Sequence, residues 1–210
     1  MDATAARLKK MEKKLGAIVE KDFARKNDGH EPGHPARVCK MAMHLQAKEG
    51  GDIVVLIIAT WLHDYHRLSR GKNGHGCHPK NSLKRVRKII SELGIKLSST
   101  RMKKILNCVK YHEEGTDSTP KNARCIETAI IQDADAINEL GATGLIRDFR
   151  FSGAHNIPVN DAIAHMCKGG AATFGRRKIN TASAIPIAEA RFALMVDFFR
   201  KFHDEEHGEA

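Results

Sequence analysis

Apolar residues recur along this chain with the spacing of amphipathic helices rather than with the alternation of strands. Val38, Met41, Ala42 and Leu45 fall at positions i, i+3, i+4 and i+7. Three further windows carry apolar stripes of helical spacing: Val54 to Trp61, Leu83 to Leu93 and Met102 to Val109. Each window predicts a helix that buries one face against the rest of the protein.

Two more helices are predicted from their ends. Thr119-Pro120 has the pattern of an N-cap followed by proline at the first helical position, which predicts a helix that carries Asp133 late in its length. A long helix is expected over Pro186 to Phe202, where it closes the bundle. It should present three apolar side chains together: Phe192, Val196 and Phe199. Residues 169–183 are poor in apolar side chains and are expected to form an exposed loop.

The composition favours a mainly helical globular domain. A hydrophobic content of 41% argues against disorder, and an aromatic content of 5% argues against a sandwich or barrel built on aromatic strands. With 210 residues and no shift of composition along the chain, we expect one domain over residues 1–210. The predicted fold class is therefore all-α, a single-domain helical bundle.

Neither a membrane span nor a secretion signal is predicted. The longest apolar run, Ile53 to Leu62, is shorter than the ~18 to 20 residues of a membrane-spanning helix, and the N-terminus lacks the apolar core of a signal peptide. The five cysteines are odd in number and widely spaced, which is typical of free thiols in a reducing compartment. A cytoplasmic protein is expected.

The formal net charge of +10 predicts attraction to polyanions, whether nucleotides, nucleic acid or anionic surfaces. The lysines and arginines are spread along the chain rather than gathered in one block. The net charge therefore does not distinguish among these partners. Only the candidate site residues can do so.

The dipeptide His63-Asp64 carries the most specific chemical signal. It directly follows an apolar run, so it offers an imidazole nitrogen and a carboxylate oxygen to one buried volume. His34 lies upstream in another predicted helix, and Asp133 and Asp135 interrupt a further apolar stretch, where a core would prefer no carboxylate. Ligands from separate helices could converge here on a metal ion.

The order His34, His63-Asp64, Asp135 resembles the HD-domain metal-dependent phosphohydrolases, a family that includes nucleoside triphosphate pyrophosphohydrolases. Further likeness lies in four short motifs: His34-x-x-Arg37-Val38, Leu62-His63-Asp64, Asp133-Ala134-Asp135 with Gly141-Ala142, and Ala188-x-x-Arg191. The resemblance implies an HD-type bundle whose metal-site core spans about 30–140 and whose C-terminal helices span about 141–205. It also implies that His34, His63, Asp64 and Asp135 hold the metal.

The two aspartates of Asp133-Ala134-Asp135 cannot both face one ion. Residues two apart on a helix point about 200° from each other, and the family pattern favours Asp135 as the ligand. Asp133 would then support the site from behind, and His30, one helical turn before His34, could do the same. Residues 136–138 are Ala-Ile-Asn where the family usually has Arg-Leu-Asp, which bears on substrate contacts more than on metal binding.

A second metal ion is an alternative that the resemblance leaves open. His78 and His112 stand at positions like those used by HD proteins that hold two metals, although twelve histidines in the chain make some coincidences certain. One ion is expected, and two would need these histidines.

Basic residues beside the ligands are candidates for contact with substrate phosphates. Arg67 stands where some HD nucleotidases carry a catalytic glutamate and other family members carry lysine, and a guanidinium can only donate hydrogen bonds and neutralise charge. Arg37 flanks His34, and Lys80 and Lys84 follow in the chain. Asp64 could take a proton in addition to binding metal.

Three functions remain open from the sequence. The leading one is a phosphohydrolase that acts on a nucleotide or another small phosphate ester or anhydride. It would use Mn, Fe, Co, Ni or Zn, with Mn favoured. The second is a two-iron HD-type oxygenase, which would need His78 and His112. The third is a non-catalytic basic module that binds nucleotide or nucleic acid, although no RNA-binding aromatic motif or helix-turn-helix signature supports it.

Overall fold

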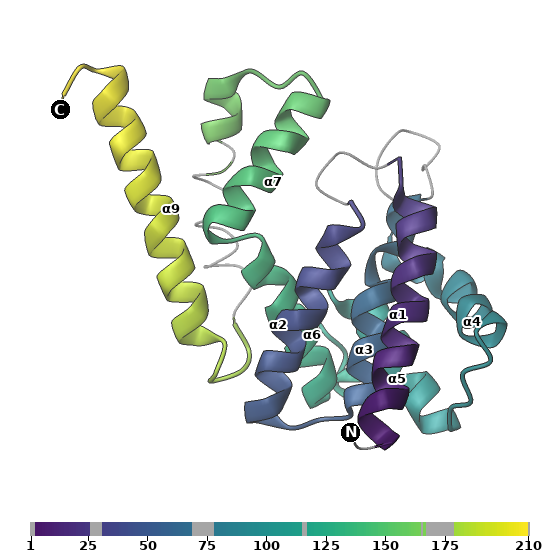
Figure 1. Ribbon diagram of the computed structural model, residues 1–210. Helices are drawn as coiled ribbons and strands as arrows, with labels where there is room; N and C mark the ends of the chain where they lie inside the picture. The colour runs from purple at the N-terminus through teal and green to yellow at the C-terminus, as the bar shows by residue number, and fades with distance from the viewer. Residues whose placement is uncertain are drawn as a thin grey trace.

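The computed structural model describes residues 3–25, 31–68, 78–114, 117–164, 166 and 179–209. Within those ranges every regular element is an α-helix or a short 3₁₀ helix, and Figure 1 shows their arrangement. The all-α prediction is therefore confirmed. None of the described helices combines the length and the apolar character needed to cross a bilayer.

The elements follow one another with short connections. The α-helices are α1 (Ala3–Phe23), α2 (Gly33–Glu49), α3 (Ile53–Leu62), α4 (Leu83–Glu92), α5 (Ser99–Tyr111), α6 (Ile126–Asn138), α7 (Gly141–Ala154) and α9 (Ile185–Glu206). The 3₁₀ helices are η1 (His63–Leu68), η2 (Pro79–Ser82) and η3 (Lys121–Ala123).

Helix α3 is the central element of the bundle. Its residues from Val55 to Leu62 are all buried, because α1, α2, α5 and α6 all pack against it. Asp52 fixes where α3 begins: its Oδ1 accepts hydrogen bonds from the backbone N–H groups of Val54 and Val55, at 3.0 and 3.4 Å. Helix α3 ends at Leu62, so His63 follows directly after the buried central helix.

The core consists of two apolar clusters. One joins α1, α3, α4 and α5 around residues such as Phe23, Ile58 and Ile105. The other joins α2, α6, α7 and α9 around residues such as Leu45 and Ile130. The apolar stripes predicted for α2, α4 and α5 line these clusters, which confirms the helical interpretation of the sequence.

Helix α9 docks on the C-terminal end of α6 and on α7 (Figure 1). Arg191 Nη1 donates to the carbonyl oxygen of Ile137 at 2.9 Å, and Ala188 is buried in the second cluster. Gly141 has a φ of +70° and lies so close to Arg191 that an added Cβ would approach that side chain to 3.1 Å. Glycine at this position lets α9 lie against the end of α6.

Two expectations for these helices were wrong. Val196 was expected in the buried stripe of α9, but 53% of it is exposed, and only Phe192 and Phe199 of that trio pack on the core. Helix α6 begins at Ile126 rather than at Pro120. Pro120 instead precedes η3, and Thr119 turns inward, where its hydroxyl oxygen accepts from Gln132 Nε2 at 3.0 Å.

The predicted exposed loop is corrected over the part that the structure describes. Residues 169–178 of that loop lie outside the described residues. The segment that follows is not wholly exposed, because Thr181 and Ala184 are buried. Both the backbone and the side chain of Thr181 bond to Asp133 of α6, so this segment is part of the packed structure.

Candidate metal centre

Four buried side chains from two α-helices and η1 converge at one point. His34 comes from the first turn of α2, His63 and Asp64 from the start of η1, and Asp135 from α6. The Nε2 atoms of His34 and His63 lie 3.1 Å apart. Asp64 Oδ2 lies 3.3 Å from the first and 3.5 Å from the second, and Asp135 Oδ1 lies 3.3 and 3.8 Å from them.

Hydrogen bonds behind the two imidazoles set which nitrogen faces the cluster. Nδ1 of His63 donates to the carbonyl oxygen of Thr60 at 2.7 Å, and Nδ1 of His34 donates to Asn138 Oδ1 at 2.9 Å. Both Nε2 atoms therefore face the cluster. Two lone pairs at 3.1 Å repel unless a proton or a cation lies between them, so this donor set fits a divalent transition metal.

The charges in the cluster hold one another in their ionised forms. Burial alone would raise the pKa of Asp64 and of Asp135, but the neighbouring imidazoles keep both pKa values well below the usual range. Burial alone would lower the pKa of His34, yet the carboxylates of Asp135 and Asp64 raise it to about 9. For His63 burial wins, and its pKa falls to about 4.

The raised pKa of His34 predicts that metal binding depends on pH. In the metal-free protein the protonated imidazole stabilises the fold fully below its ordinary pKa of 6.5, and this stabilisation is lost as pH rises through about 9. A cation has to displace that proton. We expect the affinity for Mn²⁺ to rise with pH, by up to ~10-fold per unit between pH 6.5 and 8.5. Calorimetry in buffers of different ionisation enthalpy should show about one proton released per ion; affinity independent of pH would contradict this assignment.

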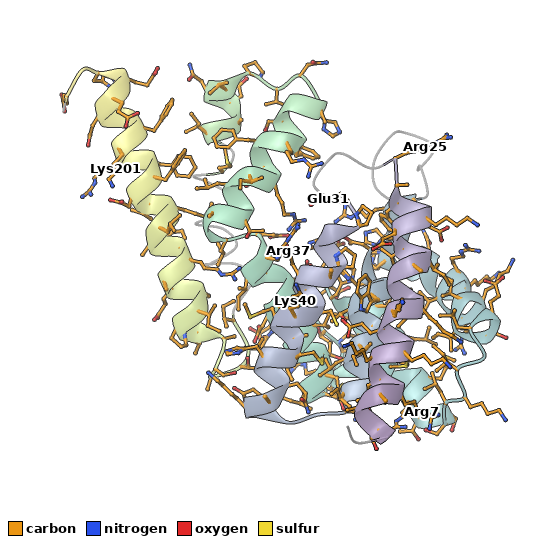
Figure 2. All side chains as sticks on the ribbon, in the orientation of Figure 1. Arg7, Arg25, Glu31, Arg37, Lys40 and Lys201 are labelled. Carbon is orange, nitrogen blue, oxygen red and sulfur yellow. The ribbon has the colours of Figure 1, made fainter. Side chains whose placement is uncertain are left out.

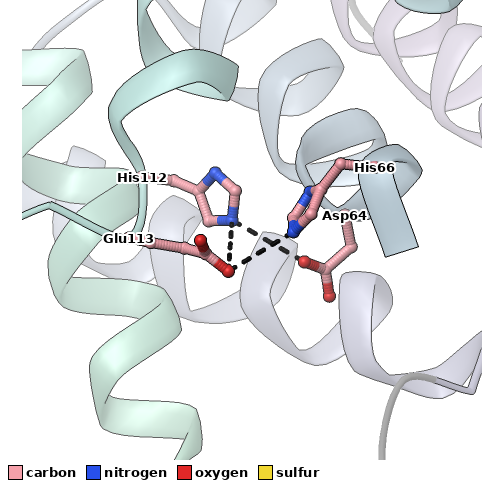
Figure 3. Close-up of side chains that lie close together, drawn as sticks. All are labelled: Asp64, His66, His112 and Glu113. Carbon is pink, nitrogen blue, oxygen red and sulfur yellow. Dashed lines mark ion pairs between the residues drawn. The ribbon is translucent and has the colours of Figure 1, made fainter. Parts of the chain in front are cut away.

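A second group of side chains adjoins the first, and Figure 3 shows it in close-up. His66 Nε2 lies 3.4 Å from Glu113 Oε1. His112 Nε2 lies 3.6 Å from Asp64 Oδ1 and 3.9 Å from Glu113 Oε1. Asp64 thus directs one carboxylate oxygen to each group. The first group is called the primary cluster below, and Asp64, His66, His112 and Glu113 are called the adjacent cluster.

The family model for the HD domain matches residues 33–140, more than half of the 210-residue chain. The chain belongs to the HD-domain family. All the side chains of the two clusters lie within the matched residues.

Two relatives extend the likeness to nearly the whole chain. The Bacillus subtilis protein YpgQ, described as uncharacterized, is 24% identical over 205 residues, which cover 95% of each protein. A crystal structure of YpgQ in complex with ADP has a TM-score of 0.70 at 20% identity and covers 95% of this chain and 100% of that one. A crystal structure of an HD-superfamily hydrolase from Bacillus thuringiensis has a TM-score of 0.70 at 26% identity, with coverage of 95% and 98%. The fold is that of the HD-superfamily hydrolases.

The arginines predicted beside the HD ligands are both paired with glutamates. Arg67 donates through Nη2 to Glu113 Oε1, and its Nε lies 3.7 Å from Asp64 Oδ1. Arg37 Nη2 donates to Glu31 Oε1 at 2.9 Å near the start of α2, where Figure 2 labels both residues. Arg67 thus lies against the adjacent cluster, whereas Arg37 is turned toward Glu31.

Three further predicted residues, His78, Lys80 and Lys84, are exposed and belong to neither cluster. Exposed His78 is the N-cap of η2, and its Nδ1 accepts from the backbone N–H of Lys80 at 3.1 Å. Lys80 and Lys84 are exposed, and His30 lies outside the described residues. Other exposed cations, such as Arg7, Lys40 and Lys201 in Figure 2, belong to different helices. Among the described residues, His112 joins the adjacent cluster while His78 does not.

Asp133 faces away from the primary cluster. It accepts four hydrogen bonds from the segment before α9: from the backbone N–H and Nδ2 of Asn180, both at 2.8 Å, and from the backbone N–H and hydroxyl of Thr181, at 2.7 and 2.6 Å. The two aspartates of α6 therefore serve opposite faces of one helix, as their spacing requires.

Three residues of the site were missed in the sequence. His66 and Glu113 complete the adjacent cluster, and Asn138 orients His34. Asn138 also accepts from Arg147 Nη1 at 3.3 Å through the same amide oxygen. A signal for Glu113 was available, since it directly follows His112, but only the fold shows that both side chains can reach Asp64.

Proposed function

We propose that this HD domain is a metal-dependent phosphohydrolase that acts on a nucleotide or a similar small phosphate ester or anhydride. The observation that supports this proposal most directly is the convergence of two imidazole Nε2 atoms and two carboxylates in one buried volume. His34, His63, Asp64 and Asp135 would hold the ion, with Mn²⁺ favoured over Fe, Co, Ni and Zn. When bound, such an ion lowers the pKa of water and polarises a phosphoryl oxygen.

The chain's own groups support the chemistry around that ion. Asp64 lies between both clusters, so it can accept a proton from a water molecule as well as bind metal. Arg67 is one-third exposed at the edge of the adjacent cluster, 3.7 Å from Asp64. From there it could donate to a phosphate oxygen and neutralise its charge.

A nucleotide is the favoured substrate class. The structure of YpgQ, which shares the fold, holds ADP, and the net charge of +10 attracts anions of this kind. The described cysteines Cys39, Cys108 and Cys125 are free thiols, which supports a reducing, cytoplasmic setting. These features support reaction classes in which phosphate or pyrophosphate leaves a nucleotide.

We also infer that the helices after residue 140 belong to the same domain as the metal-site core, so that residues 1–210 form one unit. Packing supports this assignment. The second apolar cluster joins α2 and α6 of the core to α7 and α9, and Arg191 and Asp133 provide polar ties between the two parts.

The function is tested by release of phosphate or pyrophosphate from a panel of nucleoside mono-, di- and triphosphates. Metal-stripped full-length protein would be resupplied with Mn²⁺, and His34→Ala would be compared with His44→Ala. Both histidines lie on α2, but His44 is exposed. We expect turnover in the wild type and in His44→Ala, and a loss on the order of 10³-fold in His34→Ala.

Two results would overturn the proposal. If the wild-type protein with bound Mn²⁺ released neither phosphate nor pyrophosphate from any nucleotide of the panel, nucleotide hydrolysis would be excluded as its function. Equal turnover in His34→Ala and in wild type would place any hydrolysis outside the primary cluster.

A further inference from the structure

We propose that Cys108 and Cys125 form a reversible oxidation site, in which a peroxide oxidises Cys125 and Cys108 then closes a disulfide bond with it. Neither thiol belongs to the primary or the adjacent cluster. The reaction requires neither a metal ion nor a nucleotide, so the site extends beyond the proposed function.

The two thiols come from neighbouring helices and meet at one hydroxyl group. Cys108 lies on α5, and Cys125 is the N-cap of α6, which packs against α5. Cys108 Sγ lies 3.7 Å and Cys125 Sγ lies 3.3 Å from Thr128 Oγ1. The Thr128 hydroxyl is itself held in place, because it donates to the carbonyl oxygen of Ala123 at 3.0 Å. One fixed oxygen therefore holds two sulfur atoms from different helices beside each other.

The two thiols differ in exposure, and this difference assigns their roles. Cys125 is partly exposed, whereas Cys108 is fully buried. A peroxide in solution can therefore reach Cys125 before it reaches Cys108. Oxidation of Cys125 produces a sulfenic acid, which condenses with a neighbouring thiol to give a disulfide. Cys108 is the neighbouring thiol and is shielded from solvent, so it is placed to resolve the sulfenic acid.

The surroundings of Cys125 favour its thiolate, which is the form that attacks a peroxide. Contact with the thiol of Cys108 and with Thr128 lowers the pKa of Cys125 to about 6, although partial burial opposes this change. The carboxylate of Glu127 also opposes it, but Lys104 Nζ lies 2.7 Å from Glu127 Oε1 and offsets that charge. Contact with Cys125 and complete burial raise the pKa of Cys108, so this thiol keeps its proton.

The oxidation balances in two steps. The Cys125 thiolate attacks one oxygen of hydrogen peroxide: an S–O bond forms, the O–O bond breaks, and the hydroxide that leaves takes a proton from solvent. The sulfur of Cys108 then attacks the sulfur of Cys125, so that an S–S bond forms, the S–O bond breaks, and the leaving hydroxide takes the Cys108 proton. The two sulfurs together lose two electrons, and the peroxide gains two. The new bond closes residues 108–125, which include His112 and Glu113 of the adjacent cluster, into a covalent loop.

A metal ion is the alternative partner for two neighbouring thiols. A zinc site needs about four ligands. Among the described residues, the groups of His, Cys, Asp and Glu that could hold an ion include neither Cys108 nor Cys125. The remaining described cysteine, Cys39, is buried on α2 with its Sγ 3.8 Å from Glu12 Oε1, and burial raises its pKa to about 12. Cys39 is therefore an unreactive reference thiol within the same chain.

The test maps the disulfide after mild oxidation. Reduced full-length protein would be treated with a small excess of hydrogen peroxide, blocked with iodoacetamide and digested with trypsin without reductant. Cleavage after lysine and arginine places the two thiols in peptides 105–110 and 125–147. We expect mass spectrometry to find these two peptides joined in most chains and separated again after dithiothreitol. The same protein unfolded in urea shows the background of random pairing among the five cysteines.

Three variants assign the two roles. Cys125→Ser should leave Cys108 as a reduced thiol after peroxide treatment. Cys108→Ser should leave Cys125 as a sulfenic acid, which dimedone traps. Cys39→Ser is the matched control and should keep the link between the two peptides. Circular dichroism would show that each variant folds, and Cys125→Ser, at a partly exposed position, decides the matter if Cys108→Ser does not fold.

The outcomes separate this site from the proposed function, because no Mn²⁺ or nucleotide is present. If peptides 105–110 and 125–147 stay unlinked in the folded wild type, the proposal is wrong. Links scattered among the cysteines as in the unfolded chain would also overturn it, and so would oxidation of Cys108 in Cys125→Ser. A specific, reducible link in a protein that hydrolyses no nucleotide would support the oxidation site while overturning the proposed function.

Discussion

Asp64→Asn is expected to reduce nucleotide hydrolysis by on the order of 10³-fold or more. The substitution preserves the shape of the side chain but removes the charge that both clusters share. It leaves His34 and His63 without one of their two carboxylate neighbours, at 3.3 and 3.5 Å. Bound Mn²⁺ should fall together with turnover, which steady-state kinetics and metal analysis on the same preparation would show.

Asp197→Asn is the control for this change, because Asp197 is an exposed aspartate on α9 that pairs only with nearby Arg200 and Lys201 in the described structure. It should leave turnover and metal content unchanged. If Asp64→Asn kept wild-type turnover, Asp64 would be neither a metal ligand nor a proton acceptor in the reaction.

Asp133→Ala is expected to lower the free energy of unfolding by about 3–5 kcal/mol. The carboxylate of Asp133 is 1% exposed and accepts four hydrogen bonds from Asn180 and Thr181. Truncation removes the acceptor of these donors in a packed region, although Asn180 Nδ2 also donates to Gln132 Oε1 at 3.2 Å. Loss of the acceptor of a buried donor is costly. Urea denaturation followed by circular dichroism would measure the loss.

Asp117→Ala removes the same groups from an exposed aspartate and should change the unfolding free energy by less than about 0.5 kcal/mol. Equal stability of Asp133→Ala and Asp117→Ala would show that the bonds to residues 180 and 181 contribute nothing net to folding.

Apolar periodicity was enough to predict which segments form helices. It did not predict where a helix begins when contacts of individual polar side chains set that boundary. The stripes of α2, α4 and α5 follow the 3.6-residue period because each helix buries one face. The start of α6 follows from the inward turn of Thr119 toward Gln132, a partner thirteen residues away. No local pattern at Thr119-Pro120 encodes that contact.

The side chains of the primary cluster could be predicted because ionisable residues in apolar helices are few, and because the resemblance to the HD family favours Asp135 over Asp133. His66 was missed for a geometric reason. On an α-helix, residues three apart point about 60° from each other, whereas on a 3₁₀ helix they are eclipsed. Residues His63–Leu68 form a 3₁₀ helix, so His66 follows His63 and Arg67 follows Asp64 along the same direction.

Helix α6 places Asp135 in the primary cluster on one face and Asp133 against residues 180 and 181 on the other. One helix therefore carries both a proposed metal ligand, Asp135, and the residue that anchors the segment before α9, Asp133. If docking of α9 and cation binding both favour the same position of α6, docking increases the affinity for the cation. Cation binding then stabilises the docked helix by the same free energy, because coupling between two sites is reciprocal. The C-terminal helix would then act as an effector of cation affinity without touching the ion.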